Sequence, residues 1–468
     1  MRANLAWYTV PRLLSRGSAL LLLPVYTRVL SPADLGAAMV VLAVGGVLSL
    51  VVAPGIDAVY FRWVHQPSAS ADERTGRTGT VAAAHFGMLV LTVGALAGGA
   101  GTISAWLLPG IPAWPLFHLI LATAVLGSIA VPRQTAWRAE GRAERFAAFE
   151  MVYSATAIAV TLMALFVGRL GALSLVLGNF VAWVVLLPWY AGQFIRDLRR
   201  GWDVSLVSSM VPLVLVGLPL ALSSWALSAL DRIFLNRLAG TLEVGLFSAA
   251  AQVGSGITLF AIILNKEWQP TIFNLLRNGK DGEIEALRRL WTGSFSVFLA
   301  FGSVLAVIAR LVVDVVLGEE FVASATIVPL IVLAAVLRVP RVFMVNVGLA
   351  SGRTRDVAIE SVLSVAVFIV ANLALIPSFG ILGAALAGVL AHGAGVLFLF
   401  SRRWNVLGVN RHMGIWGVVL ISSVVLGNVA GDGGFVKLAG MVVGAFFVRE
   451  VAAYWLVLGA LSQYKSVR

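Results

Sequence analysis

Charged side chains inside long apolar segments are the residues of this sequence best suited to chemistry. The cations are Arg16, Arg62, Arg232, Arg338 and Arg341, and the acids are Asp57, Asp231 and Glu267. A charge within a bilayer is costly, so each is expected to face a polar cavity or an oppositely charged partner. Arginine presents a planar fork of N–H donors that matches phosphate oxygens. The excess of arginine therefore predicts a cationic cavity that binds an anionic substrate.

The three acids allow two interpretations. They are candidate sites for a coupling ion, or they hold helices together, in which case Asp57 pairs with Arg62 and Asp231 with its neighbour Arg232. Glu267 opens a charged segment and is also explained by exposure to water. Arg62 lies close enough to a membrane interface to extend its guanidinium into water. The sequence leaves these alternatives open.

Motifs for catalysis and for metal binding are missing from the sequence. There is no HExxH, no phosphate-binding loop ending in GK[ST], no acidic metal motif and no cysteine, and the five histidines are scattered. These absences argue against an enzyme and predict no cofactor. Without a nucleotide-binding loop, transport has to be driven by an H⁺ or Na⁺ gradient, by the membrane potential or by the substrate gradient.

The composition is that of a membrane protein. Of 468 residues, 60% are hydrophobic and only 12% are charged, and the mean hydropathy is +0.95. Soluble domains carry about 25% charged residues, so this surface is suited to lipid. The net charge of +12 is explained by cations in cytoplasmic loops, and nucleic acid is not an expected partner.

The apolar segments predict an all-α polytopic protein with about fourteen transmembrane helices, because about 20 apolar residues cross a bilayer as a helix. The expected spans are 8–29, 36–62, 81–108, 114–133, 147–167, 170–194, 206–235, 244–264, 290–313, 321–349, 357–376, 381–401, 414–429 and 435–461. Residues 65–79 are expected to form a polar loop, and residues 266–289 an amphipathic, charged loop. Alternate loops are rich in arginine and lysine, which places them and both termini in the cytoplasm. We expect no cleaved signal peptide.

An internal duplication organises the chain. Residues 27–36 resemble residues 236–245, with Arg, an acid and Gly at the same spacing, 209 residues apart. GRAE at 141–144 and GRLGA at 168–172 resemble GRTR at 352–355 and GILGA at 380–384, at offsets of 211 and 212. The predicted domains are therefore a six-helix lobe at 1–204, a second six-helix lobe at 205–405, and two further helices with a cytoplasmic tail at 406–468. Since six is even, the lobes form a parallel repeat.

Several segments resemble the polysaccharide transporter family. They are LLLPVYTRVLSPADLGAAMVV, SALDRIFLNRLAGTLEVGLFSAA, NKEWQPTIF and IPSFGILGAALAGVLAH, and the resemblance extends over most of residues 5–405. It implies an oligosaccharide flippase of the bacterial inner membrane, in the superfamily that also contains multidrug exporters and lipid II flippases. The implied substrate is an undecaprenyl-pyrophosphate-linked oligosaccharide for exopolysaccharide, capsule or O-antigen synthesis. It is bound in a cationic cavity between the lobes and moved by alternating access. Membrane lipids and a glycan polymerase or export complex are implied partners.

Three other functions are considered. A cation-coupled multidrug exporter of the same fold predicts acidic residues deep in the cavity, whereas arginine dominates the intramembrane set. A membrane scaffold for glycan assembly leaves intramembrane arginines without a purpose. A glycosyltransferase or polymerase needs a sizeable extramembrane segment with acidic metal ligands, and no such segment is evident.

Overall fold

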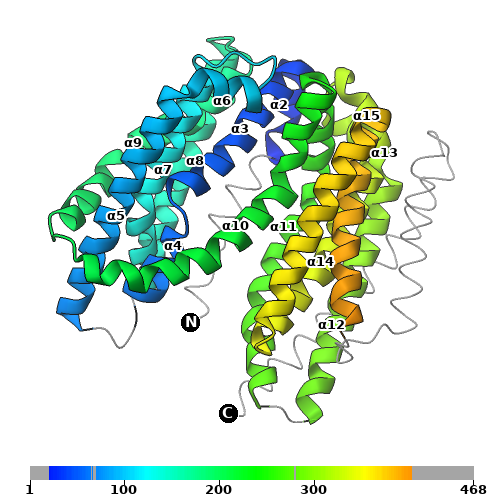
Figure 1. Cartoon of the computed structure of the whole chain (residues 1–468). Coiled ribbons are helices and arrows are strands. Elements are labelled where there is room, and N and C mark those ends of the chain that lie inside the picture. Colours follow the sequence, from blue (N-terminus) through cyan, green and yellow to red (C-terminus); the bar gives the residue numbers. More distant parts are fainter. Residues whose placement is uncertain (1–19, 65, 67–69, 279–280, 403–468) are drawn as a thin grey trace. The chain divides into compact units, whose positions relative to one another are not determined.

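The computed structural model describes residues 20–64, 66, 70–278 and 281–402, and every regular element within these ranges is helical (Figure 1). Ten helices in this part of the chain are long and apolar enough to cross a membrane. The longest, Thr354–Ser401, is two helices merged across Gly380, whose backbone is not helical. The all-helical membrane fold is as predicted. Expected spans 414–429 and 435–461 and most of 8–29 lie outside the described residues.

The elements before residue 240 are α2 Leu23–Val29, α3 Pro32–Val52, α4 Ile56–Val59, the π-helical turn η1 Tyr60–Val64, α5 Ala71–Gly98, α6 Ala100–Leu107, α7 Leu116–Ala139, α8 Ala143–Phe166, α9 Leu173–Leu198 and α10 Val204–Leu238. The elements after it are α11 Thr241–Asn278, α12 Asp281–Val307, α13 Ala309–Val316, the 3₁₀ helix η2 Glu319–Thr326, α14 Val328–Ala350 and α15 Thr354–Ser401.

Two predicted loops are wrong. The segment 266–289 is mostly helix, because α11 continues to Asn278 and α12 begins at Asp281. The buried side chains of Trp268 and Ile272 give this extension of α11 an apolar face. Similarly, α5 begins at Ala71 and takes up much of the expected loop 65–79. Charged residues at the ends of these helices conceal their apolar faces from a hydropathy reading.

The helix boundaries reproduce the duplication. Helices α2 and α10 end 209 residues apart, α3 and α11 begin 209 apart, and both ends of α6 and α13 differ by 209. Helices α8 and α15 begin 211 apart. Gly141 and Gly352 both take a left-handed conformation, with φ of 70° and 74°. The amide after each glycine donates to the carbonyl five residues earlier at 2.8 Å, which is the same helix-terminating turn in both copies.

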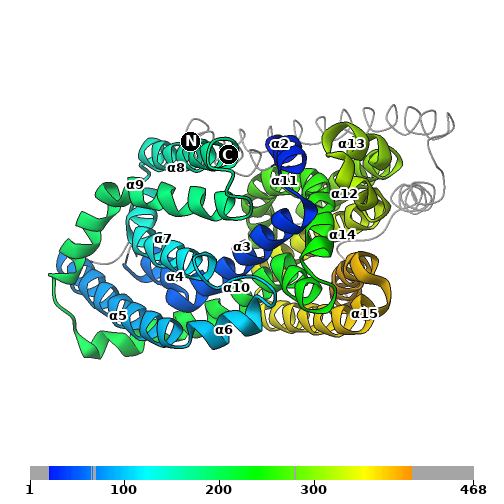
Figure 2. The same ribbon diagram turned by 90° about the horizontal axis from the view of Figure 1, so that it is seen from above.

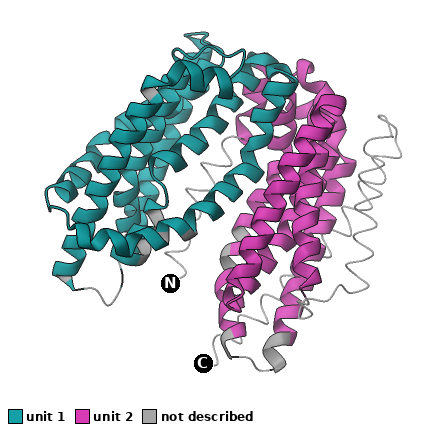
Figure 3. Ribbon diagram, viewed as in Figure 1, with its two compact units in different colours: residues 1–19, 29–245 teal, residues 20–28, 246–468 magenta. Residues whose placement is uncertain are grey.

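Two compact units are present, and Figure 3 colours them separately. Among the described residues, the first unit holds Val29–Gly245 and the second holds residues 20–28 and 246–402. All of α2 except Val29 thus lies in the second unit, and α10 lies in the first. The predicted lobes 1–204 and 205–405 describe how the sequence duplicates, and stay predictions.

The exchanged helices make equivalent contacts in the two units. In the second unit, Arg28 donates to the carbonyl of Val315 at 3.1 Å. In the first, Arg237 donates to the carbonyl of Trp106 at 3.0 Å. Arg28 and Arg237 are 209 residues apart, as are Trp106 and Val315. The same offset relates the contact of Thr27 with the Gly318 amide to that of Asn236 with the carbonyl of Pro109.

Helices α3 and α11 approach within the first unit at repeat-equivalent glycines. A Cβ atom at Gly36 would overlap the carbonyl oxygen of Thr241, and one at Gly245 would overlap that of Pro32. The contact is reciprocal, because Pro32 and Thr241 begin the two helices and each glycine lies four residues further on.

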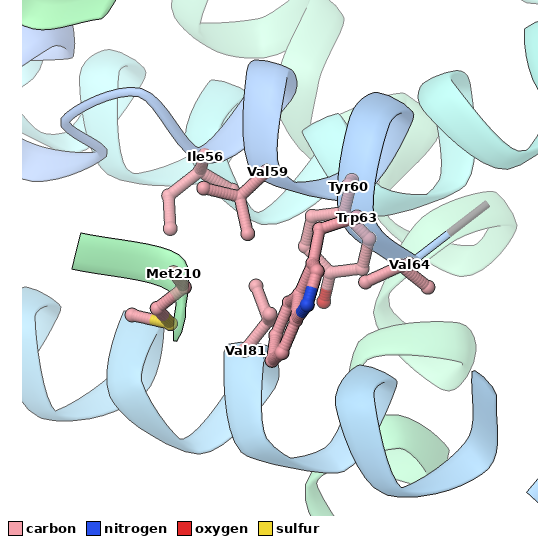
Figure 4. Close-up of a cluster of buried hydrophobic side chains, with 7 residues drawn as sticks. All are labelled: Ile56, Val59, Tyr60, Trp63, Val64, Val81 and Met210. Atoms are coloured by element: carbon pink, nitrogen blue, oxygen red, sulfur yellow. The ribbon is translucent and has the colours of Figure 1, made fainter. Parts of the chain in front are cut away.

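Packing in the first unit joins α3, α7, α9 and α10, and Figure 2 shows α7 between α3 and α9. The cluster in Figure 4 combines α4, η1, α5 and α10 through seven buried side chains: Ile56, Val59, Tyr60, Trp63, Val64, Val81 and Met210. In the second unit, α14 packs against α12 and α15. Trp268, Trp291 and Phe343 join α11, α12 and α14 in its core.

Candidate functional site

The candidate site lies in the second unit, on α14 and the two arms of α15. Helix α15 reverses at Gly380, which has a φ of 52° and a ψ of −128°. The reversal brings Gly383 against the carbonyl of Leu375. Further from the turn, Gly395 on the second arm meets Glu360 on the first. Two antiparallel arms thus enclose Glu360 against α14.

Glu360 is fully buried and ion-paired with Arg341. Both guanidinium contacts are made: Arg341 Nε donates to Oε1, and Nη2 donates to Oε2 at 3.2 Å. The side chain of Glu360 is 0% exposed and that of Arg341 is 13% exposed. Fork-to-carboxylate pairing is the geometry that best offsets the desolvation of two buried charges. The pair leaves little net charge at this point of the membrane-spanning part.

Hydroxyl groups and a histidine complete the surroundings of this pair. Ser364 Oγ donates to Glu360 Oε1 at 2.7 Å, and Ser361 Oγ lies 3.5 Å from Oε2. On the second arm of α15, His392 is buried and its Nδ1 has no hydrogen-bond partner. Its imidazole interacts electrostatically with Arg341 and Arg338. The cluster thus joins α14 and both arms of α15 through an ion pair, two hydroxyl groups and an imidazole.

Gly395 closes the cluster on the side of the second arm. A Cβ atom there would overlap Glu360 Oε1 and lie 3.3 Å from Arg341 Nε. His392 lies three residues before Gly395, so the two residues share one face of the helix. The backbone approach that Gly395 permits therefore also brings His392 to the side of α15 that faces the ion pair.

A second pair of charges lies in the first unit, near the end of α10. Asp231 Oδ1 accepts from the Arg232 amide at 2.8 Å and from Arg232 Nη1 at 3.1 Å. The same Nη1 donates to the carbonyl of Ser228 at 2.8 Å. These contacts are made along one helix. The roles predicted for Asp231 and Arg232, in ion coupling or in holding helices together, stay predictions.

The structure brings together two of the predicted cationic residues, Arg338 and Arg341, one turn apart on α14. Arg16 and the side chains of Asp57, Arg62 and Glu267 lie outside the described residues, so their roles also stay predictions. The sequence analysis missed Glu360. The available signal was a single acid early in the apolar span 357–376, with serines one and four residues later.

At this site the Arg341 guanidinium is already neutralised by Glu360, and the Glu360 carboxylate is shielded from solvent. Within the described residues, no group of three or more His, Asp or Glu side chains is arranged to hold a metal ion. The arrangement can bind an anion through the Arg341 guanidinium once Glu360 no longer pairs with that guanidinium.

Comparison with known proteins gives one family match and several relatives. A family described as "polysaccharide biosynthesis protein" matches residues 1–276, more than half of the chain. An uncharacterized membrane protein of Haemophilus influenzae is 26% identical over 187 residues, covering 38% of this chain and 45% of that protein. A protein of the Lsg locus of the same organism is 24% identical over 221 residues, covering 45% and 54%. The chain thus spans about half the length of these curated relatives.

Solved structures share the fold over most of the chain. The lipid II flippase MurJ, in an inward closed conformation, superposes with a TM-score of 0.70 and 14% identity, over 98% of this chain and 99% of that one. A multidrug resistance MATE family transporter of the MOP superfamily gives a TM-score of 0.65 and 14% identity, over 86% and 98%. The Vibrio cholerae MATE transporter VcmN, as a mutant, gives 0.54 and 17%, over 88% and 98%.

Proposed function

We propose that this chain, which belongs to the family of polysaccharide biosynthesis proteins, is a flippase for a lipid-linked oligosaccharide. The substrate is an undecaprenyl-pyrophosphate-linked unit, and the process is the synthesis of exopolysaccharide, capsule or O-antigen. Movement is by alternating access, from the cytoplasmic to the outer leaflet of the bacterial inner membrane. A glycan polymerase or export complex is the partner that would take up the product.

One observation carries this proposal: two arginines, Arg338 and Arg341, lie one turn apart within a membrane-spanning helix of a flippase-like fold. Intramembrane arginines are costly and are typical of substrate pathways. A diphosphate is the charged group of the proposed substrate, and the guanidinium fork matches its oxygens. The lipid II flippase that shares this fold supports a substrate of the same general kind.

A leaflet assay tests the proposal. Full-length protein is reconstituted in liposomes that contain a fluorescent undecaprenyl-pyrophosphate-linked oligosaccharide, and a glycan-cleaving enzyme is added outside. We expect the inner-leaflet pool to become accessible faster than in protein-free liposomes. Arg338→Ala with Arg341→Ala should abolish the acceleration, and Arg-to-Lys changes should restore part of it. Arg310→Ala is the matched control, because Arg310 pairs with Asp314 at an exposed position of the same unit.

Full acceleration by the double alanine variant would refute the assignment of the two arginines. A wild-type protein that gives no acceleration, but drives dye efflux with a sodium or proton gradient, would support the second function, a cation-coupled multidrug exporter. The buried acid Glu360 favours that alternative, because drug exporters with cation coupling need an intramembrane acid. The pairing of Glu360 with Arg341 argues against it, since a cationic drug would meet a neutralised site.

A further inference from the structure

Glu360 is a buried acid that the proposed transport cycle leaves unexplained. It is fully buried in a membrane-spanning helix, and both carboxylate oxygens accept a hydrogen bond from Arg341. An anion that binds the same guanidinium has to compete with this carboxylate. If Arg341 turns to the anion, Glu360 is left as a charged, buried and unpaired group. Such a group is costly and is relieved most simply by taking up a proton.

The surroundings favour a proton over a metal ion at this position. Sodium or another metal cation needs several oxygen ligands free to converge on it. Oε1 already accepts from Arg341 and Ser364, and the nearby charges are the cations Arg341 and Arg338. A proton needs one oxygen lone pair and no cage. The hydroxyl of Ser364 can stay bonded to a protonated carboxyl, because a hydroxyl both donates and accepts.

His392 is the group beside the pair that can pass on a proton. Glu360 is 0% exposed, so water does not reach its carboxylate directly. The titratable and hydroxyl groups around the pair are Arg338 from α14, His392 from the second arm of α15, and Ser361 and Ser364 of its own arm. Of these, an imidazole can both accept and donate a proton. The Nδ1 atom of His392 is buried and has no hydrogen-bond partner.

We propose that Glu360 and His392 form a proton-binding site that exchanges with the anionic substrate for Arg341. When a phosphate of the substrate takes the Arg341 fork, Glu360 gains one proton from the solvent through His392. When the phosphate leaves, Glu360 returns the proton and pairs with Arg341 again. Arg341 stays protonated throughout. The inference rests on the proposed function, since it needs an anion at Arg341, and it assigns proton coupling to residues of the second unit.

Calorimetric titration of the full-length protein with farnesyl diphosphate tests this exchange. Titrations in buffers of different ionisation enthalpy give the number of protons taken up per bound ligand. Working near pH 8 keeps the probe ionised, because phosphate groups take their second proton near pH 6. We expect about one proton per ligand for the wild-type protein, and binding that tightens by up to about tenfold for each unit of pH decrease. Glu360→Gln should bind more tightly, without proton uptake and with little dependence on pH.

Two further variants keep the exchange testable if Glu360→Gln does not fold. Arg341→Gln removes the ion pair, so Glu360 should already hold a proton and any residual binding should take up none. His392→Gln should keep the proton number and slow the uptake followed by a pH indicator after rapid mixing. The control is Asp314→Asn, an acid paired with Arg310 at an exposed position of the same unit, which should behave as wild type.

The outcomes separate this inference from the proposed function. Diphosphate binding without proton uptake in the wild-type protein would overturn the exchange and leave the flippase proposal intact. Uptake that persists in Glu360→Gln would assign the proton to another group and would also overturn it. If the probe does not bind at all, both the exchange and the role of Arg341 in substrate binding are refuted.

Discussion

Alanine at Gly36 or Gly245 tests the close approach of the first turns of α3 and α11 within the first unit. An added Cβ atom would lie well inside the contact distance of about 3.5 Å from the carbonyl oxygen of Thr241 or Pro32. The helices would have to separate by about 1 Å or more. Overpacking of this kind costs typically 1–3 kcal/mol. The upper half of that range applies, because the obstacle is backbone and does not change rotamer.

Alanine also favours a helix over glycine by about 1 kcal/mol. The net loss in free energy of unfolding should therefore be about 1–2 kcal/mol for either single substitution. Gly87→Ala is the matched control, because Gly87 lies within the spanning helix α5 with no atom within 4 Å of its added Cβ. It should be neutral or stabilising by up to about 1 kcal/mol. Test and control should thus differ by about 1–3 kcal/mol in the detergent-solubilised protein.

The two substitutions should not be additive. Once the first alanine has moved the helices apart, the second enters space that is already open. The double variant Gly36→Ala with Gly245→Ala should therefore lose less than the sum of the single losses, with a coupling of about 0.5–3 kcal/mol. Thermal unfolding of the four proteins measures this cycle. If both single variants behave like Gly87→Ala, or if the losses add, the close reciprocal crossing is wrong.

Two further predictions concern electrostatics. Arg341→Ala should lower the free energy of unfolding by about 3–5 kcal/mol, because it leaves Glu360 buried without its partner, whereas Arg341→Met with Glu360→Leu should be nearly neutral in the same thermal unfolding assay. Hydrogen bonds from Ser205 lower the pKa of the exposed helix cap Asp203. Its stabilisation is therefore present above the ordinary aspartate pKa and lost as pH falls through the lowered value. Asp203→Asn should keep the cap and lose this pH dependence, as unfolding measured against pH will show.

The duplication and most spans were predictable because they depend on local patterns. Apolar length gives a span, and glycine with arginine marks a turn: Gly141 and Gly352 are each followed by arginine, and both take a left-handed conformation. The charged stretch after Leu264 was misread as a loop. There, Trp268 and Ile272 supply a buried helical face that mean hydropathy over the segment does not reveal.

The chemistry of the site was less predictable, because it depends on contacts between distant residues. Arg341 was recognised as a costly intramembrane charge, but its partner Glu360 lies 19 residues away, on another helix. His392 was one of five scattered histidines until the reversal at Gly380 placed its arm of α15 beside Glu360. A lone acid in an apolar run carries the same sequence signal whether it faces water or an arginine. Only the fold distinguishes the two.

The grouping of α2 with the second unit and of α10 with the first could not be predicted from the sequence, because the two repeats are similar. The sequence is equally compatible with a contact of Arg28 with Val315, in the other repeat, and with a contact of Arg28 at the equivalent position of its own repeat. In the structure, Arg28 contacts the second copy, and its equivalent Arg237 contacts Trp106 of the first. Reciprocal exchange of one element is the arrangement of a domain-swapped dimer. Here a single chain carries both copies, and α10, which follows the predicted boundary 204/205, is grouped with the first unit, while the predicted lobes stay predictions.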